Sequence, residues 1–243
     1  MRRIGLLVLA GTLALGAASC SSQPSLGSLQ GKTPEQILDL AQRAALADHF
    51  AFQFVDQTRS SKKTTTLSGY SAPNGAQQSL AAPQPVLQVV QVSNGDIYVR
   101  GALDYVVPAL GISTGAADSL KGRWVLVHPG QGQYSTVTAL LNGENVLTNF
   151  EPVARLSTGS PETLHGREVV GISGTPPPSA GSSVKSLTLF VPTTAPHTPV
   201  GAALTLGSGS SGGTEVVVFK DWGAHFYAAT PQNVVEFSAL TGT

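Results

Sequence analysis

One helix-forming segment followed by many short strand-forming segments constrains the fold of this chain more than any other feature. Thr33-Pro34-Glu35-Gln36 has the residues of a helix start, with Thr as N-cap, Pro at the first helical position and Gln three residues after the cap. Apolar residues recur at helical spacing over 37–45, with polar residues between them. This predicts an amphipathic helix that must lie on another layer of the fold.

From residue 50 onward the apolar period changes to two. Phe50, Phe52 and Phe54 alternate with other residues, which predicts a strand with one aromatic face. Asn94-Gly95 lies between two β-prone runs and predicts a hairpin, because this dipeptide suits the tight turn that joins two strands. Strands are predicted at 86–92, 97–100, 123–127, 168–172, 184–191, 203–206 and 215–219.

The remaining segments indicate a single α+β domain over residues 32–243. Short helices are predicted near 103–120 and 134–141, and Gly- and Pro-rich breaks separate the later strands. No repeat recurs at a fixed period, and no polar linker divides the chain. One helix ahead of many antiparallel strands favours a curved sheet packed on helices.

The first twenty residues have the pattern of an export signal. Arg2 and Arg3 precede an uncharged apolar run at 4–18, and small residues come before Cys20. A run of about 15 apolar residues is too short to span a bilayer comfortably. The ending resembles a bacterial lipobox, in which the cysteine is acylated. We therefore predict a signal peptide at 1–19 and a lipidated Cys20, followed by a flexible Ser-, Gly- and Gln-containing tether to Gly31.

Cys20 is the only cysteine of the chain, and its alternative role is a buried thiol after an ordinary signal. A lone cysteine cannot form an intramolecular disulfide, so the exported domain depends on its hydrophobic core. We predict that the protein lies at the outer face of the cytoplasmic membrane, in the cell envelope, and is attached to that membrane by its N-terminal lipid anchor.

The charge pattern argues against two classes of partner. After cleavage before Cys20, 12 Lys and Arg stand against 14 Asp and Glu, a formal charge of −2. Nucleic-acid binding requires a basic stripe, and adhesion to anionic lipid requires a polybasic segment. We expect neither, and no nucleic-acid partner.

Several segments match one family pattern in order. They are a Gly-Asp-Ile-Tyr-Val strand at 95–99, Gly-Arg-Trp-Val-Leu-Val at 122–127, Leu-His-Gly-Arg-Glu-Val-Val-Gly at 164–171, an apolar strand at 187–192, and Val-Val-Phe-Lys-Asp-Trp-Gly at 217–223 with Pro231 after it. With the lipobox, tether and first helix, the chain resembles the LolA/LolB-like carriers, and more closely the actinobacterial lipoproteins of the LppX/LprG type. The long Gly-, Pro- and Ser-rich insertions depart from that pattern.

The resemblance implies an antiparallel sheet curled into an incomplete β-barrel, with helices packed on or lidding the concave face. It further implies a non-enzymatic protein that binds a lipid, a glycolipid or a lipidated molecule in an apolar cavity, for transport or presentation. A membrane transporter or a second carrier would then be a partner. The alternative is an envelope sensor or interaction module of the same fold, which binds a regulatory partner and transfers no lipid.

Three alternating apolar sets are the candidates for lining such a cavity. They are Phe50, Phe52 and Phe54; Leu187, Leu189 and Val191; and Val217 and Phe219. Each set also suits an ordinary core, and the sequence does not say which face of the sheet is inward.

Catalytic chemistry is not expected. The G-x-S-x-G pattern occurs at 111–115, around Ser113, and at 209–213, but a nucleophile elbow needs a buried strand before the serine and a helix after it. The second match leads into a strand and is interpreted as a turn. For Ser113, a role as a nucleophile is the alternative to a loop position. The five histidines are scattered without metal-ligand spacing. We predict no enzyme activity, no metal and no cofactor.

Overall fold

The computed structural model describes residues 27–56, 65–73, 75–81, 85–207 and 213–241. Its helical segments are η1 (Gly27–Leu29), α1 (Pro34–Leu46), α2 (Leu103–Leu110), η2 (Thr114–Leu120), α3 (Tyr134–Leu141), α4 (Gly143–Thr148), η3 (Pro178–Ala180) and α5 (Phe237–Thr241). Its strands are β1 (Phe50–Asp56), β2 (Thr65–Ala72), β3 (Gly75–Ala81), β4 (Pro85–Gln91), β5 (Ile97–Gly101), β6 (Trp124–Val127), β7 (Ala154–Thr158), β8 (Glu162–Leu164), β9 (Arg167–Thr175), β10 (Val184–Pro192), β11 (Gly201–Leu206), β12 (Thr214–Lys220) and β13 (Val234–Glu236). The predicted signal peptide and Cys20 lie outside the described residues.

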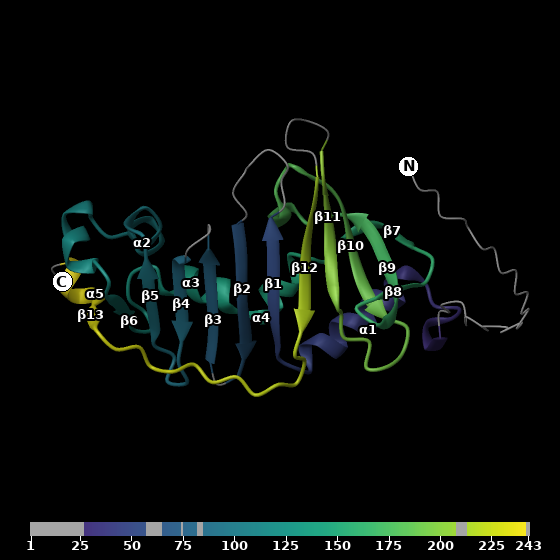
Figure 1. Ribbon diagram of the computed structural model, residues 1–243, viewed down its shortest axis with the longest axis horizontal. Helices are drawn as coiled ribbons and strands as arrows, with labels where there is room; N and C mark the ends of the chain where they lie inside the picture. Colours follow the sequence, from purple (N-terminus) through teal and green to yellow (C-terminus); the bar gives the residue numbers. More distant parts are fainter. Residues whose placement is uncertain (1–26, 57–64, 74, 82–84, 208–212, 242–243) are drawn as a thin grey trace, which may run out of the picture.

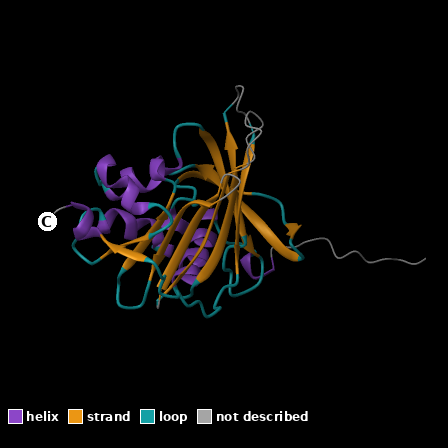
Figure 2. Cartoon of the chain, turned by 60° about the vertical axis from the view of Figure 1, so that its left-hand side comes forward, coloured by secondary structure: helices purple, strands orange, loops and turns teal. Residues whose placement is uncertain are grey.

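All thirteen strands form one open sheet in the order β13-β6-β5-β4-β3-β2-β1-β12-β11-β10-β9-β7, with β8 paired to β9 (Figure 1). The pairing of β1 with β12 joins a first half, β1–β6 with β13, to a second half, β7–β12. Every pairing is antiparallel except that of β13 with β6. The sheet does not close, and its strands curve around the helices (Figure 2). The predicted α+β class and incomplete barrel are confirmed.

The helices cover one face of the sheet, here called the inner face. Helix α1 packs on β7 and β9, α3 on β3 and β4, and α4 on β2. Helix α2 packs on β4 and β5, and α5 on β6 and β13. Within the described residues, no helix is both long enough and apolar enough to cross a membrane.

Helix α1 begins where the sequence predicts. The Thr33 hydroxyl accepts a hydrogen bond from the Gln36 backbone N–H, and the Gln36 side chain accepts one from the Thr33 N–H. This reciprocal capping box satisfies two N–H groups that the first helical turn leaves unpaired. Ile37, Ala41 and Ala45 follow at four-residue spacing and are buried against the sheet.

The first described residues, which the sequence assigns to the end of the predicted tether, pack on the domain. Gly27–Leu29 forms a helical turn held by a hydrogen bond of 3.1 Å from the Ser28 N–H to the Thr193 carbonyl. The Leu29 side chain is fully buried in the core beside α1. The folded domain therefore includes Gly27, because Leu29 supplies apolar surface that the Ser- and Gly-rich composition around it concealed.

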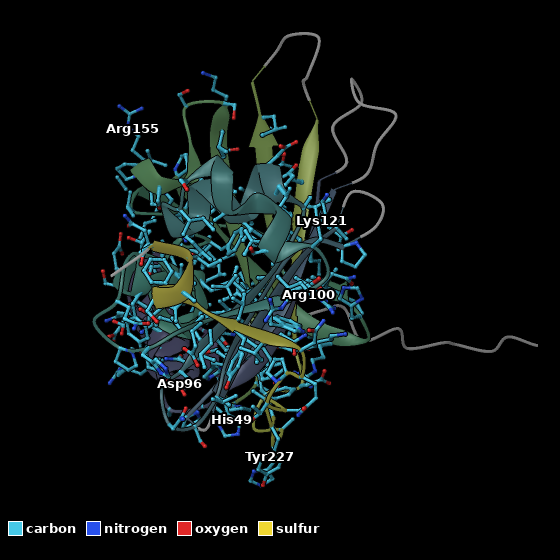
Figure 3. All side chains as sticks on the ribbon, turned by 90° about the vertical axis from the view of Figure 1, so that its left-hand side faces the viewer. His49, Asp96, Arg100, Lys121, Arg155 and Tyr227 are labelled. Atoms are coloured by element: carbon cyan, nitrogen blue, oxygen red, sulfur yellow. The ribbon has the colours of Figure 1, made fainter. Side chains whose placement is uncertain are left out.

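One edge of the sheet, here called the lower edge, collects the start of β1, the β2–β3 and β4–β5 turns, the loop after β10 and the end of β12. A strap of residues 221–233 runs along this edge from β12 to β13 (Figure 1). In the strap, Phe226 stacks on Tyr70 of β2 with ring centroids 4.8 Å apart. Tyr227 extends from the lower end of the molecule (Figure 3).

Candidate ligand pocket

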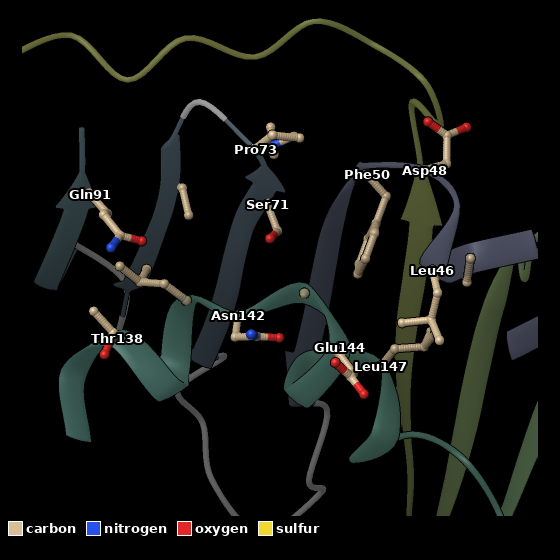
Figure 4. Close-up of a pocket in the computed structure, with 15 residues that line it drawn as sticks. Leu46, Asp48, Phe50, Ser71, Pro73, Gln91, Thr138, Asn142, Glu144 and Leu147 are labelled. Atoms are coloured by element: carbon tan, nitrogen blue, oxygen red, sulfur yellow. The ribbon is translucent and has the colours of Figure 1, made fainter. Parts of the chain in front are cut away.

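A pocket of about 490 Å³ lies on the inner face between α1 and the α3–α4 pair. It is called the seam pocket below. Its lining residues are Ala45, Leu46, Asp48, Phe50, Ser71, Ala72, Pro73, Ala76, Gln91, Thr138, Leu141, Asn142, Gly143, Glu144 and Leu147. Figure 4 shows Phe50 pointing from β1 toward these helices, with Gln91 and Thr138 at one end of the pocket.

The strand residues that line the seam pocket all come from the lower ends of their strands. Phe50 begins β1, Ala72 ends β2, and Gln91 ends β4. Pro73 belongs to the β2–β3 turn and is exposed. Leu46 is the last residue of α1, and 57% of its surface is exposed. The pocket therefore lies at the lower edge, where solvent reaches its mouth.

The space is unfilled because small side chains face inward where the two halves of the core meet. One core cluster, under α1 and α4, includes Phe50 and Leu147; the other, under α2, α3 and α5, includes Ala76 and Leu141. On β2, Ser71 and Gly69 face inward between them, since they pair with Phe50 and Phe52 of β1. Neither can fill the gap that a larger side chain would occupy.

The α3–α4 junction fixes the opposite wall. Asn142 ends α3 and begins α4, and its side-chain oxygen accepts a hydrogen bond of 3.2 Å from the Asn145 N–H. Gly143 approaches β2 so closely that a Cβ there would lie 2.9 Å from Ser71 Oγ and 3.2 Å from the Phe50 ring. A glycine at this position lets α4 sit directly on β2.

The lining combines an apolar wall with a polar rim. About half of the lining residues are apolar, and the ionisable ones are the two acids Asp48 and Glu144. One Asp48 oxygen accepts a hydrogen bond of 2.9 Å from the His49 N–H. Carboxylates at the rim repel phosphate but accept hydrogen bonds from hydroxyl groups. The pocket thus suits an apolar group attached to a neutral, hydroxyl-bearing group.

A buried acid fastens α1 beside the pocket. The side chain of Gln42 donates a hydrogen bond of 2.6 Å to Glu151, which is 5% exposed. Burial raises the pKa of the Glu151 carboxyl, while the hydrogen bond from Gln42 acts in the opposite direction. This contact joins α1 to the chain that follows α4, so it bears on the position of both walls.

The structure separates the eight residues that the sequence singled out. Phe50 lines the seam pocket. Phe52 and Phe219 belong to the same core cluster as Phe50 and reach two pockets on other sides of the sheet. Three more of the eight, Leu189, Val191 and Val217, are fully buried in that same cluster. Leu187 packs in a small cluster with Val184 and Leu204, and the side chain of Phe54 lies outside the described residues.

A larger pocket of about 600 Å³ lies at the lower edge of the second half. Arg167 and Lys220 line it together with Asp48 and Asp221. Arg167, Lys220 and Asp221 are exposed, so water solvates their charges. Opposite charges of this kind favour neither an anionic nor a cationic ligand, and the seam pocket is the stronger candidate.

Ser113 lacks the surroundings of a catalytic nucleophile. Helix α2 precedes it, and Ser113 is exposed at the start of η2. The strand–turn–helix arrangement of a nucleophile elbow is therefore missing at this serine. The second G-x-S-x-G match, at 209–213, falls largely outside the described residues. In the part of the chain that the structure describes, no three His, Cys, Asp or Glu side chains form a metal-binding group.

Two histidines have structural partners. His128 follows β6, and its Nδ1 lies 2.7 Å from Asp96 Oδ1, while its Nε2 lies 3.3 Å from Glu236 Oε2. The hydrogen bond with Asp96 is the main reason why the pKa of His128 is raised. His197 Nδ1 lies 2.8 Å from the Pro192 carbonyl, and its Nε2 lies 3.3 Å from Ser28 Oγ. The first group joins β13 to the sheet, and the second holds η1.

The fold defines an α+β protein with an open, curled sheet and helices on its inner face. No protein-family model and no curated protein sequence matches the chain. Solved structures similar to it include LprF from Mycobacterium bovis, with a TM-score of 0.47, 15% identity and coverage of 82% of this chain and 96% of that one. Lipoprotein LppX from Mycobacterium tuberculosis has a TM-score of 0.44 and 15% identity over 79% and 98% of the two chains. MucB from Pseudomonas aeruginosa, in its complex with MucA, has a TM-score of 0.40 and 15% identity over 82% and 58%.

Proposed function

We propose that this protein is a lipid-anchored envelope protein that holds the acyl chain of a lipid, a glycolipid or a lipidated molecule in the seam pocket. Cys20 carries the anchor at the outer face of the cytoplasmic membrane, and the bound molecule is transported or presented there. The observation that carries the proposal is the unfilled volume between the two core clusters, open at the lower edge. Its size lies within the range of small-molecule pockets.

The apolar wall supplies the affinity in this proposal. Each methylene that leaves water for the pocket contributes ~0.8 kcal/mol, so six methylenes contribute about 5 kcal/mol before the cost of ordering the chain. Phe50, Leu141 and Leu147 provide this surface from β1, α3 and α4. No special polar chemistry is required to hold hydrocarbon.

The polar rim supplies the selectivity. The acids Asp48 and Glu144 and the amides Asn142 and Gln91 all line the pocket, with Asp48 on the side of the lower edge and Glu144 on the side of α4 (Figure 4). Hydroxyl groups donate hydrogen bonds to these oxygens, whereas a phosphate would face two like charges. We therefore expect a glycolipid or another neutral acylated molecule to bind more tightly than an anionic phospholipid. A membrane transporter or a second carrier would receive it.

The test compares masses of the mature, acylated protein purified from membranes. A covalent anchor persists after denaturation, whereas a pocket ligand is lost, so the difference between native and denatured mass is the mass of the ligand. We expect a reproducible difference that corresponds to an acylated molecule. Identical native and denatured masses in protein taken from its own envelope would contradict the proposal.

A matched pair of substitutions on α3 locates the ligand. Thr138 lines the pocket, and its hydroxyl donates to backbone carbonyls of its own helix, so Thr138→Trp places an indole in the pocket without removing a hydrogen bond to another element. Thr136 lies on the same helix, is exposed and does not line the pocket. We expect Thr138→Trp to lose the ligand mass and Thr136→Trp to keep it, with thermal unfolding showing that both variants fold.

A sensor or interaction module is the second candidate function, because the outer face of the second half offers apolar surface to a protein partner. Val216 is 38% exposed on β12, and Val218, Ala203 and Phe190 line up beside it across β12, β11 and β10. Transfer of labelled lipid between vesicles would favour the carrier. A stoichiometric membrane-protein partner without any transfer would favour the sensor.

A further inference from the structure

The lower edge exposes two large apolar side chains, one of which lines the seam pocket. Leu46, at the end of α1, is 57% exposed, and Tyr227, in the strap, is 78% exposed. Pro73 is also exposed at the β2–β3 turn. Burying these side chains against an apolar surface would be favourable, because it removes apolar area from water. This edge is therefore suited to an apolar or interfacial partner.

The strap holds Tyr227 in an outward position. Its neighbour Phe226 stacks face to face on Tyr70, with ring centroids 4.8 Å apart and 13° between the planes. On the other side, Ala228 packs on the outer-face cluster of Val90 and Leu126. Because both neighbours are fixed on the sheet, Tyr227 extends from the lower end of the molecule (Figure 3). An aromatic ring with a polar tip is the side chain best suited to the membrane–water interface.

The chain enters the domain at this same edge. Ser28 donates from its N–H and its hydroxyl to the Thr193 carbonyl, at 3.1 and 2.9 Å, and Thr193 directly follows β10 at the lower edge. Leu29, buried in the core, fixes this point. Six residues lie between Cys20 and Gly27, so the seven Cα–Cα steps place an anchor at Cys20 at most about 25 Å from η1. The anchored segment therefore joins the domain at the lower edge, which lies within reach of the bilayer.

Electrostatic attraction contributes little to contact between the lower edge and a membrane. The lower edge presents Arg167 and Lys220, but Asp48 and Asp221 line the same pocket. At the other end of the edge, His128 stands between two acids. Attraction to anionic lipid requires an excess of basic residues within a Debye length. Contact between this edge and a membrane must therefore come from apolar insertion together with the anchor.

We propose that the lower edge docks on the lipid bilayer with Leu46 and Tyr227 inserted, so that the mouth of the seam pocket opens onto the membrane surface. This inference rests on the proposed function, because it requires the anchor at Cys20. An anchor on a tether attaches the domain to the membrane, and a second apolar contact fixes which edge of the domain faces the bilayer. Docking in this orientation lets an acyl chain pass between membrane and pocket without crossing water.

The test places a spin label at four exposed positions of the full, acylated protein on vesicles. Because Cys20 is the only native cysteine and its thiol is consumed by acylation, each introduced cysteine is the one free thiol. Leu46→Cys and Tyr227→Cys report on the lower edge. Val153→Cys and Tyr105→Cys are the matched controls, since Val153 is 56% and Tyr105 42% exposed and Val153 pairs with Thr175 at the upper end of β9.

On phosphatidylcholine vesicles we expect the labels at Leu46 and Tyr227 to be reached by oxygen and to lose contact with an aqueous nickel chelate. The labels at Val153 and Tyr105 should stay accessible to the chelate. Adding phosphatidylglycerol should change neither result. The docking is wrong if all four labels remain in water, if the control labels insert, or if insertion requires phosphatidylglycerol.

The outcome separates docking from ligand binding. Labels that stay in water on a protein whose native mass includes a ligand would refute the docking and leave the pocket intact. Labels that insert, on a protein that carries no ligand, would support the docking and refute the carrier function. A protein whose Cys20 is not acylated would refute the anchor on which both proposals depend.

Discussion

The second half of the sheet is covered by one long helix, α1, whereas several short elements, α2, η2, α3 and α5, cover the first half. Each half closes its own core, with Leu189 and Val217 fully buried in one and Ile97 and Val125 fully buried in the other. Helix α4 rests on β2 between the two halves, but small side chains face inward there and leave a gap beside the helix. Two cores that pack separately leave a cavity at their boundary, and we propose that the ligand binds there.

The outer faces of the halves differ as well. The strap covers the outer-face cluster of the first half through Ala228, beside Tyr98 and Val90. Val216 remains 38% exposed on the outer face of the second half. The first half is therefore packed on both faces, whereas the second half leaves apolar surface exposed on its outer face.

The largest expected change in the free energy of unfolding distinguishes the packed core from the wall of the seam pocket. Leu189→Ala should lower the free energy of unfolding by about 3 kcal/mol, because it leaves a cavity in a packed core. Leu46→Ala, on the exposed pocket mouth, should change it by no more than about 0.5 kcal/mol. Chemical denaturation measures both, and equal losses would show that the mouth is packed as tightly as the core.

The next effect tests the contact that closes the boundary. Gly143→Ala should cost about 2 kcal/mol, because its Cβ would press on Ser71 and Phe50 and move α4 away from β2. Gly115→Ala is the control, since the nearest side-chain atom to its Cβ would be Ser113 Oγ at 3.9 Å. A neutral Gly143→Ala in thermal unfolding would mean that α4 does not rest on β2.

A smaller effect, an increase in folding stability, is expected when the buried acid Glu151 is replaced. The pKa of Glu151 is raised in the folded state, so its protonated form favours folding. The stability that this proton provides is present below the unfolded pKa and is lost as pH rises through the folded one. Glu151→Gln should therefore raise stability at neutral pH, on the order of 1 kcal/mol, and remove this pH dependence. A destabilised Glu151→Gln at neutral pH would contradict the assignment.

The smallest expected change in stability concerns His128, which contacts the edge strand β13 through Glu236. The pKa of His128 is raised by Asp96, so its contribution is present below the unfolded pKa and is lost as pH rises through the folded one. The His128 side chain is 44% exposed, and solvent screening limits the contribution to about 0.5 kcal/mol. His128→Gln should flatten the stability profile just above pH 6.5. An unchanged profile would show that the two acids do not bind the protonated ring.

Much of the fold could be predicted because its strongest patterns are local. The capping residues of α1, the alternation in β1, and Asn94-Gly95 between β4 and β5 each specify an element from a few neighbouring residues. Strands β2 and β3 were not predicted, because their sequences, TTLSGYSA and GAQQSLA, are small and polar. They form strands because β1 and β4 pair with them on either side.

The pocket could be predicted only in part, for a related reason. Phe50 was a candidate because aromatic alternation is visible in sequence. Ser71, Gly143 and Leu46 were not, because an unfilled volume arises from small residues of distant segments that meet only after folding. Fully buried candidates such as Leu189 lie in the packed core of the second half.

The most direct measurement is a crystal structure of the protein purified from its own membranes. We expect elongated density in the seam pocket, beside Phe50, Leu141 and Leu147, with its polar end near Asp48 at the lower edge (Figure 4). An empty pocket closed by α4, or ligand density between Leu189 and Val217 with that core opened, would contradict the proposed site.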